Sequence, residues 1–213
     1  MARSTVRRTA ARTKAARPET KGERTRAALV EASYHLFLSR GYHGTSMRDI
    51  ADEAGLALGG IYNHFATKED IFVAMLMERH PFIEVIPALQ AAQGETVEAL
   101  VRDAARRMIA ALNNQPDFLN LIFIELVEFE GRHVSQMFQI FFPPLLEFAQ
   151  RFQQVNGPLR PLPLPVLLRS FIGLFFSYVI TGLLIDNQLP AAARSGAFDH
   201  FVDIYLHGIL AEN

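Results

Sequence analysis

The sequence of 213 residues contains no cysteine and no tryptophan, and its formal net charge at pH 7 is only −1. The absence of cysteine excludes disulfide bonds, thiolate metal sites and a cysteine nucleophile, and it fits a reducing cytoplasm. Half of the residues are hydrophobic, which supplies a substantial core and excludes global disorder. The balanced charge, taken alone, argues against a protein that binds nucleic acid.

The charges are unevenly distributed along the chain. Residues 1–50 contain 11 basic and 4 acidic side chains, whereas residues 51–213 contain 10 basic and 18 acidic ones. This asymmetry indicates a polyanionic partner for the basic part. Residues 1–22 have almost nothing to bury and are expected to form a flexible basic arm. No apolar stretch precedes Leu29, so we expect no secretory signal, and an organelle transit peptide is the less favoured interpretation of the arm.

An amphipathic helix is predicted between Glu23 and Gly41, because one face carries Leu29, Ala32, Ser33, Leu36 and Phe37. A second helix is expected to start at Thr45, whose hydroxyl can cap it, and to end at Gly55. Two short helices joined by a tight glycine-containing turn and packed on a preceding helix indicate a helix-turn-helix.

The third helical pattern places three apolar residues on its buried face, namely Leu58, Ile61 and Phe65. The intervening residues are small or polar and must face outward. Small outward residues allow a helix backbone to approach base edges in a major groove, and the polar ones can donate to phosphates. A fourth helix is expected to begin at Thr67, with Asp70 in its first turn, and to run toward Pro81 or Pro87.

Residues 45–71 resemble the DNA-binding signature of the TetR/AcrR family of transcriptional regulators, and the resemblance extends back to residue 24. The most specific part is the string Gly-Gly-Ile-Tyr-Asn-His-Phe-Ala-Thr-Lys-Glu at residues 59–69. Ala57 and Leu58 depart from the family pattern, which usually has a Ser or Thr cap and often a polar contact residue here. The recognition helix is therefore expected to lack a side-chain N-cap, and Leu58 offers only an apolar contact.

The resemblance implies an all-α fold of about nine helices. It divides the chain into the arm at residues 1–22, a three-helix helix-turn-helix DNA-binding domain at residues 23–70 and a helical effector-binding and dimerisation domain at residues 71–213. The residues that it places at or near DNA are Thr45, Ser46, Arg48, Leu58, Gly59, Gly60, Tyr62, Asn63, His64 and Lys68.

The C-terminal two-thirds is interpreted from its hydrophobic periodicity. Residues 95–113 form a good amphipathic pattern, whereas residues 117–130 are apolar nearly all round and are expected to form a central helix that is buried on every side. Residues 134–155 are expected to form a helix that is kinked or broken at Pro143 and Pro144, because proline removes a helix amide and clashes with the preceding turn.

Residues 166–185 carry one charge, Arg169, and are long and apolar enough to span a bilayer. One interpretation is therefore a membrane-anchored helix-turn-helix protein. The favoured interpretation is a buried dimer helix, because the amphipathic helix at residues 197–211 is a suitable partner and the family pairs its last two helices in a four-helix dimer interface. The expected interface residues are Gly173, Ser177, Thr181, Phe198, Phe201, Val202, Tyr205 and Ile209.

The resemblance also implies a sensor that binds a small molecule, and 17 phenylalanines suit an apolar, aromatic or lipid-like effector. The candidate ligand-binding residues are Met108, Leu112, Phe123, Phe138, Phe141 and Tyr178. Glu125 lies inside the apolar stretch and has two interpretations: a partner for a cationic ligand or, as we prefer, a rim position beside Glu128.

No sequence motif points to catalysis or to a cofactor. His200, Asp203 and His207 lie opposite the contact face of the last helix, so we expect them in water rather than around a metal ion. The sequence therefore predicts a cytoplasmic homodimeric regulator, most simply a repressor, that binds a pseudo-palindromic double-stranded DNA operator and is released by an effector. No enzymatic activity, cofactor, metal or membrane attachment is expected.

Overall fold

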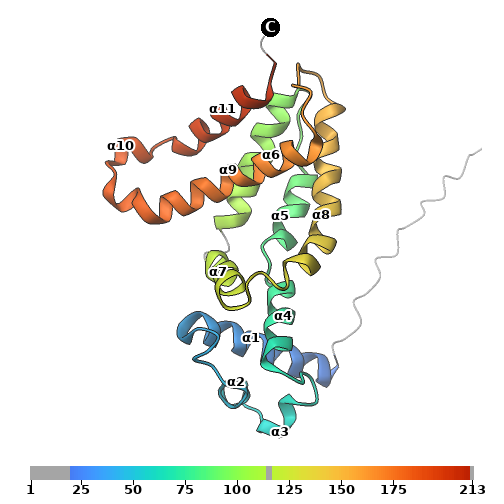
Figure 1. The fold of residues 1–213 in the computed structure, drawn as a ribbon, viewed down its shortest axis with the longest axis vertical. Helices are drawn as coiled ribbons and strands as arrows, with labels where there is room; N and C mark the ends of the chain where they lie inside the picture. The colour runs from blue at the N-terminus through green and yellow to red at the C-terminus, as the bar shows by residue number, and fades with distance from the viewer. Residues whose placement is uncertain (1–19, 114–116, 212–213) are drawn as a thin grey trace, which may run out of the picture.

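A computed structural model of the chain describes residues 20–113 and 117–211, and these residues form an all-α structure (Figure 1). The predicted fold class is confirmed. The described residues contain eleven α-helices rather than about nine, because the segment after residue 67 forms two helices and a short extra helix, α10, lies near the C-terminus. Two short 3-10 helices complete the helical elements of this part of the chain.

The head of the molecule consists of four helices at its N-terminal end: α1 (Lys21–Arg40), α2 (Met47–Glu53), α3 (Leu58–Ile61) and α4 (Lys68–Glu78). Three of them begin with a reciprocal capping box, in which the cap hydroxyl accepts from the third helical amide and an acidic side chain accepts from the cap amide. These pairs are Thr20 with Glu23, Ser46 with Asp49, and Thr67 with Asp70. The predicted cap at Thr67 is confirmed, whereas the predicted cap at Thr45 is wrong by one residue.

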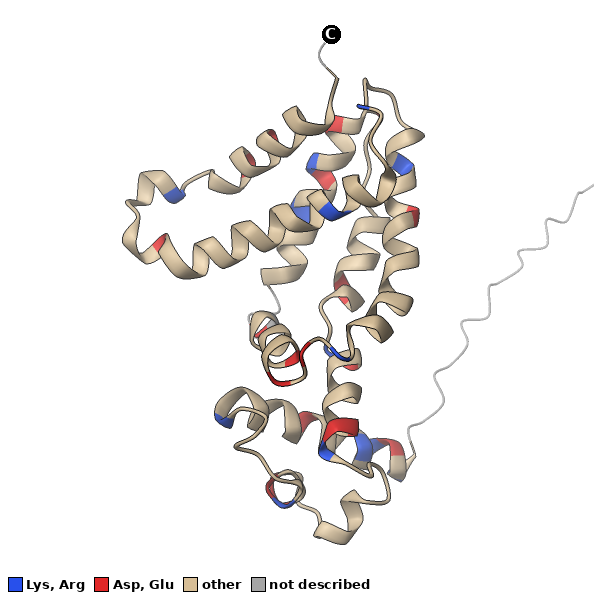
Figure 2. Cartoon of the chain, viewed as in Figure 1, with Lys and Arg blue, Asp and Glu red and all other residues tan. Residues whose placement is uncertain are grey.

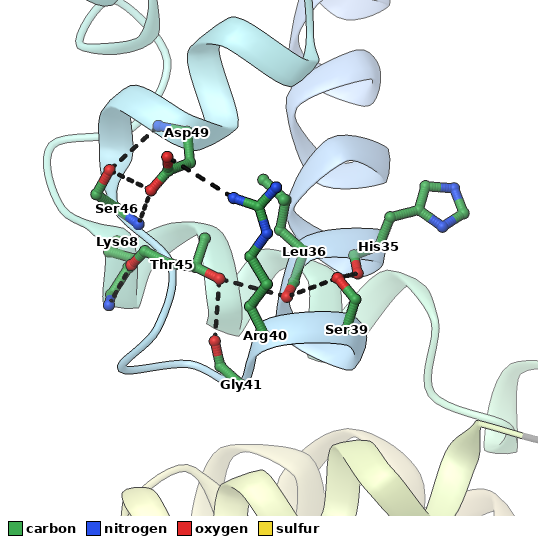
Figure 3. A network of polar contacts seen from close by, with 9 residues as sticks. All are labelled: His35, Leu36, Ser39, Arg40, Gly41, Thr45, Ser46, Asp49 and Lys68. Atoms are coloured by element: carbon green, nitrogen blue, oxygen red, sulfur yellow. Dashed lines mark hydrogen bonds and ion pairs between the residues drawn. The ribbon is translucent and has the colours of Figure 1, made fainter.

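Thr45 does not cap α2 because its hydroxyl forms hydrogen bonds in the interior of the head. The side chain is buried and donates to the backbone oxygens of Gly41 at 3.0 Å and Leu36 at 3.3 Å (Figure 3). The predicted inner face of α1 is buried around it, and the core of the head continues through Ile50, Ile61 and Phe72.

A second core fills the body, which contains the remaining helices. These helices are α5 (Phe82–Gln90), α6 (Val97–Asn113), α7 (Phe118–Glu128), α8 (Val134–Gln150), α9 (Leu164–Ile185), α10 (Ala191–Arg194) and α11 (Ala197–Ile209). The helix that starts after Thr67 ends at Glu78, before Pro81, and α5 then continues through Pro87. Phe82 and Ile86 of α5 pack against both cores, so this helix joins the head to the body.

Two expectations about the middle of the body are wrong. Helix α7 is not buried on every side, because Phe123, Leu126 and Val127 are exposed, the last at 75%. Helix α8 is not broken at Pro143 and Pro144 but runs unbroken from residue 134 to residue 150. Its turns on either side of the prolines are anchored in the two cores by buried apolar side chains, which offsets the backbone hydrogen bonds that the prolines lack.

Helix α9 and the turn that follows form the one described stretch, Leu164–Gln188, whose length and composition would allow it to cross a membrane. Its first half belongs to the core of the body, where Leu167, Leu168, Phe171 and Phe175 are buried. Helix α11 packs against this half, and α9, α10 and α11 together form a hairpin that projects to one side of the body (Figure 1).

Candidate nucleic-acid interface and effector cavity

The turn between α2 and α3 is fixed by its backbone. Gly55 adopts a φ of 68°, the left-handed conformation that favours glycine, and the amide of Leu56 donates to the oxygen of Ala51 at 2.8 Å. Ala57 starts α3 without a side-chain cap, as predicted. The third helix is shorter than the predicted pattern, but Ile61 and Phe65 are buried as expected.

The outward face of α3 contains two glycines at positions where neither steric crowding nor backbone conformation in the described structure requires a glycine. A Cβ atom built on Gly59 or Gly60 would meet no atom within 4 Å, and neither residue has a positive φ. Helix α3 lies at the end of the head farthest from the body (Figure 1). Its backbone, which carries no side chains at these two positions, is therefore accessible and could enter the major groove of DNA.

The polar side chains around α3 are mostly exposed. Ser46, Arg48, Tyr62 and Asn63 are exposed, whereas Leu58, Gly60 and His64 are partly buried. Arg48 has no ion-pair partner among the described residues. Hydrogen bonds from the side chain and the backbone amide of Ser46 lower the pKa of the Asp49 carboxyl. The capping box thus keeps the start of α2 negatively charged and the exposed Arg48 available.

Lys68 has a structural role that the sequence did not indicate. Its ammonium group donates to the backbone oxygens of Tyr42 at 2.6 Å and Thr45 at 2.7 Å, and it lies 4.0 Å from the centre of the Tyr42 ring. Burial lowers its pKa. The polar groups of Lys68 and Thr45 therefore bind backbone oxygens of the head and hold the connection between α1 and α2 (Figure 3).

The helix-turn-helix itself is not basic. Residues 45–71 contain two basic and five acidic side chains, and both signs are interspersed over the head (Figure 2). The basic arm lies mostly outside the described residues.

The turn between α7 and α8 inserts into the head. The Phe129 ring stacks on Phe72 of α4 with 4.6 Å between ring centres, and it meets the Tyr42 ring edge-on at the same separation. Glu130 and Gly131 follow with positive φ values of 53° and 74°, which reverse the chain before α8. An aromatic contact therefore couples the body to the head.

A buried polar chain lies beside this aromatic contact. Glu125 of α7 is fully buried and accepts hydrogen bonds from the His133 amide at 2.7 Å, with His133 Nδ1 at 2.8 Å from its second oxygen. His133 Nε2 lies 3.2 Å from the Glu69 carboxylate in the first turn of α4. The preferred rim position for Glu125 is wrong, because both of its oxygens are occupied by His133 in the interior.

A cavity of about 500 Å³ lies among α7, α8 and α9, next to the start of α5. Two of the predicted ligand-binding residues, Phe138 and Phe141, line it. The other four do not. Met108 belongs to the core of the body, Leu112 packs against that core, Phe123 is exposed and Tyr178 contacts the rings of Phe198 and Phe201.

Two polar residues of the cavity were not among the predicted ligand-binding residues. His80 is buried, its Nδ1 accepts from the Phe82 amide at 3.2 Å, and its ring stacks on Phe141. Burial lowers its pKa to about 4, so it is neutral at pH 7. Arg169 also lines the cavity. The signal that could have found it is its position as the lone charge in residues 166–185.

The expected dimer residues divide into two sets. Val202, Tyr205 and Ile209 are buried within the subunit, where the Tyr205 hydroxyl donates to the Leu167 oxygen at 3.0 Å. They cannot face a partner in this conformation. Phe198 and Phe201 are partly buried, Gly173 and Ser177 are exposed, and Thr181 is intermediate.

The outer face of α11 is partly used within the subunit. Asp203 forms an ion pair with Arg102 of α6 at 2.7 Å, so it does not point freely into water as expected. His207 Nδ1 lies 2.7 Å from the Asp203 backbone oxygen. Ile204, which is not one of the expected interface residues, is 72% exposed on this helix.

Comparison with known proteins gives consistent matches to the head. The family model described as "Bacterial regulatory proteins, tetR family" matches residues 29–75. The HTH-type transcriptional repressor KstR2 of Mycobacterium tuberculosis is 43% identical over 51 residues, which are 24% of this chain and 26% of the repressor. The matched segment thus spans about a quarter of that relative's length.

Solved structures match nearly the whole fold. The fatty acid degradation regulator FadR from Bacillus halodurans aligns with a TM-score of 0.67 at 17% identity, covering 89% of this chain and 97% of that chain. FadR from Bacillus subtilis, solved in complex with stearoyl-CoA, aligns with a TM-score of 0.62 at 17% identity, covering 86% and 98%. At these identities the likeness establishes the arrangement of helices in head and body.

Proposed function

Because this chain belongs to the TetR family of bacterial regulatory proteins, we propose that it is a transcriptional regulator that binds an operator in double-stranded DNA through α2 and α3. The observation that carries this proposal is the open backbone at Gly59 and Gly60, where no contact with the described residues requires a glycine. Tyr62 and Asn63 follow Gly60 closely in the sequence and Arg48 is exposed on the adjacent α2, so phosphate and base contacts can form together.

The regulator acts as a homodimer that reads a pseudo-palindromic operator. Two heads reach successive major grooves when the half-sites are about 34 Å or a multiple of this distance apart. The proposed interface uses the accessible face of α9 and α11, with Gly173, Ser177 and Ile204 as contacts. Their exposure in the subunit supports this choice over the buried Val202, Tyr205 and Ile209.

The cavity receives a small apolar effector that controls DNA binding. Ile122 of α7 and Val134 and Met137 of α8 line it, and the turn between these two helices holds Phe129 and His133 against α4. An effector that binds one arrangement of α7 and α8 more tightly shifts α4 and the spacing of the heads. The name of the KstR2 relative supports repression as the default action.

DNA binding is tested by selecting sites for the full-length protein from random duplex DNA and measuring affinity by fluorescence anisotropy. We expect inverted repeats among the selected sites. Asn63→Ala should relax base discrimination by about 1–3 kcal/mol at one position, and Arg48→Ala should weaken binding to all sequences and reduce the salt slope by about 1. Arg194→Ala on α10 is the matched control. Failure to select any sequence would overturn the proposal.

The dimer is tested by sedimentation of an Ile204→Arg variant. A charge in the centre of an apolar interface should convert the dimer to monomers. Val127→Arg introduces the same charge at an equally exposed position on α7 and should leave the dimer intact. Monomers in the wild type, or dimers in both variants, would contradict the proposed interface.

A further inference from the structure

We propose that the cavity binds an apolar molecule that carries a single anionic group, and that Arg169 pairs with this group. The inference rests on the proposed function in that this molecule would be the effector. The binding itself involves no DNA and is tested without it.

The wall of the cavity determines the apolar part of the ligand. Of the fourteen lining residues, twelve are apolar, and they include rings from both α8 and α9, such as Phe138, Phe142 and Phe176. The volume of about 500 Å³ lies in the range of roughly 300–1,000 Å³ typical of sites that enclose small molecules. Such a surface favours a hydrocarbon or aromatic body by removing its apolar area from water.

The charges of the cavity determine the headgroup. Among the described residues, Arg169 is the one charged residue that lines it, and no Asp or Glu does. Arg169 is an exposed residue and has no ion-pair partner among the described residues. It can therefore donate hydrogen bonds to a carboxylate at a position that water reaches, so neither charge has to lose all of its hydration.

The same arrangement disfavours a cationic ligand. Glu125 of α7 is a candidate anion, but it does not line the cavity and its two oxygens bind His133. His80, the second polar lining residue, is neutral at pH 7 and already accepts from the Phe82 amide. An amine placed in the cavity would meet no compensating charge and would be repelled by Arg169.

Three probes with one tail and different heads test the proposal: dodecanoate, 1-dodecanol and dodecylamine. Each is titrated calorimetrically into the full-length protein at pH 7, below its aggregation concentration. We expect one dodecanoate per subunit, binding about two- to fivefold more tightly than the alcohol, and the weakest binding from the amine.

Variants separate the headgroup from the tail. Arg169→Gln should reduce dodecanoate affinity to that of the alcohol and leave alcohol binding unchanged, whereas the control Arg194→Gln should change neither. Ile172→Trp should reduce the affinity for all three probes by filling the cavity, with thermal unfolding as the check that it folds. If Ile172→Trp does not fold, Phe138→Trp replaces it, because this variant fills the cavity from a more exposed position and should reduce the affinity for all three probes in the same way.

The proposal is overturned if the amine or the alcohol binds as tightly as dodecanoate, if Arg169→Gln retains the carboxylate preference, or if none of the probes binds. These outcomes are distinct from failure of the regulator proposal, in which the protein binds dodecanoate but selects no DNA sequence. A protein that selects DNA but ignores all three probes would retain its proposed function and lose this assignment of its ligand.

Discussion

The head and the body of this protein are stabilised by different means. In the head, three of four helices begin with a capping box built from residues three apart in the sequence. In the body, α5, α7, α8, α9, α10 and α11 have no side-chain cap hydrogen bond. Among the described helices of the body only α6 has such a cap, from Thr96, and ring contacts between residues far apart in the sequence, such as Phe148 with Phe171 and Phe171 with Tyr205, connect its helices.

This difference matches the two proposed tasks. Local capping fixes the starts of α1, α2 and α4, and α2 and α4 flank the uncapped α3, which suits a surface that must fit a regular DNA groove. The body depends instead on packing between distant helices, and α8 and α9, which line the cavity, take part in it, which suits the effector binding proposed above. The contact of Phe129 and His133 with α4 joins the two systems.

The largest effect is expected where head and body meet. Phe129→Ala removes a buried ring between Tyr42 and Phe72 and should lower the free energy of unfolding by about 3–5 kcal/mol in urea titrations. The control Phe123→Ala, on the exposed face of α7, should change it by less than about 1 kcal/mol. Equal losses in the two variants would mean that the α7–α8 turn does not join the cores.

The next effect concerns pH and the body. The pKa of His80 is lowered from 6.5 to about 4 by burial, so between these values the unfolded chain binds a proton that the folded chain excludes. This residue therefore does not reduce the free energy of unfolding above pH 6.5, but it lowers that free energy by about 3 kcal/mol as the pH drops from 6.5 to 4. His80→Asn, which retains an acceptor for the Phe82 amide, should lose this part of the pH dependence in urea titrations at each pH. Parallel curves for wild type and variant would refute it.

A smaller effect is expected from the arm, which supplies charge that the head lacks. Residues 1–19 contain six basic side chains and one acidic one. Deleting them should lower DNA affinity on the order of tenfold. The slope of log affinity against log salt should also become flatter, by about 0.9 for each phosphate that the arm neutralises in the intact protein.

The deletion must stop before Thr20, because this residue caps α1. Removing Thr20 as well should cost about 1 kcal/mol of stability, measured by urea unfolding, without further change in the salt slope. An unchanged slope after deletion of residues 1–19 would show that the arm does not track phosphates.

The smallest effect separates folding from recognition within the head. Gly59→Ala should raise the stability by about 0.5–1 kcal/mol, because the added methyl group meets only open space and the unfolded chain loses entropy. Gly59→Met should fold equally well but bind operator more weakly, because its side chain occupies the approach to the bases. Thermal unfolding and anisotropy on the same samples test both statements, and lower stability in Gly59→Ala would contradict the open geometry.

The sequence predicted the head well because its signals are local. The Thr67 cap, the turn at Gly55 and the buried face of α1 each depend on residues within a few positions of one another. The role of Lys68 was missed because its two acceptors, the oxygens of Tyr42 and Thr45, lie more than twenty residues away.

The body was less predictable because periodicity says which residues are apolar but not what covers them. Helix α7 is apolar nearly all round, yet Phe123 is exposed while Glu125 is buried through its pairing with His133. Periodicity likewise does not distinguish Phe138 and Phe141, which line the cavity, from Met108, which belongs to the core. The arrangement of neighbouring helices decides these outcomes.

The uninterrupted passage of α8 through Pro143 and Pro144 has a kinetic consequence. Neither proline has an amide hydrogen, so the carbonyls of Gln139 and Ile140 have no helical donor one turn later. Phe141 and Phe142, which line the cavity, lie in this turn. Bending the wall there breaks two fewer backbone hydrogen bonds than bending a fully bonded helix, so we expect faster exchange of a bound ligand.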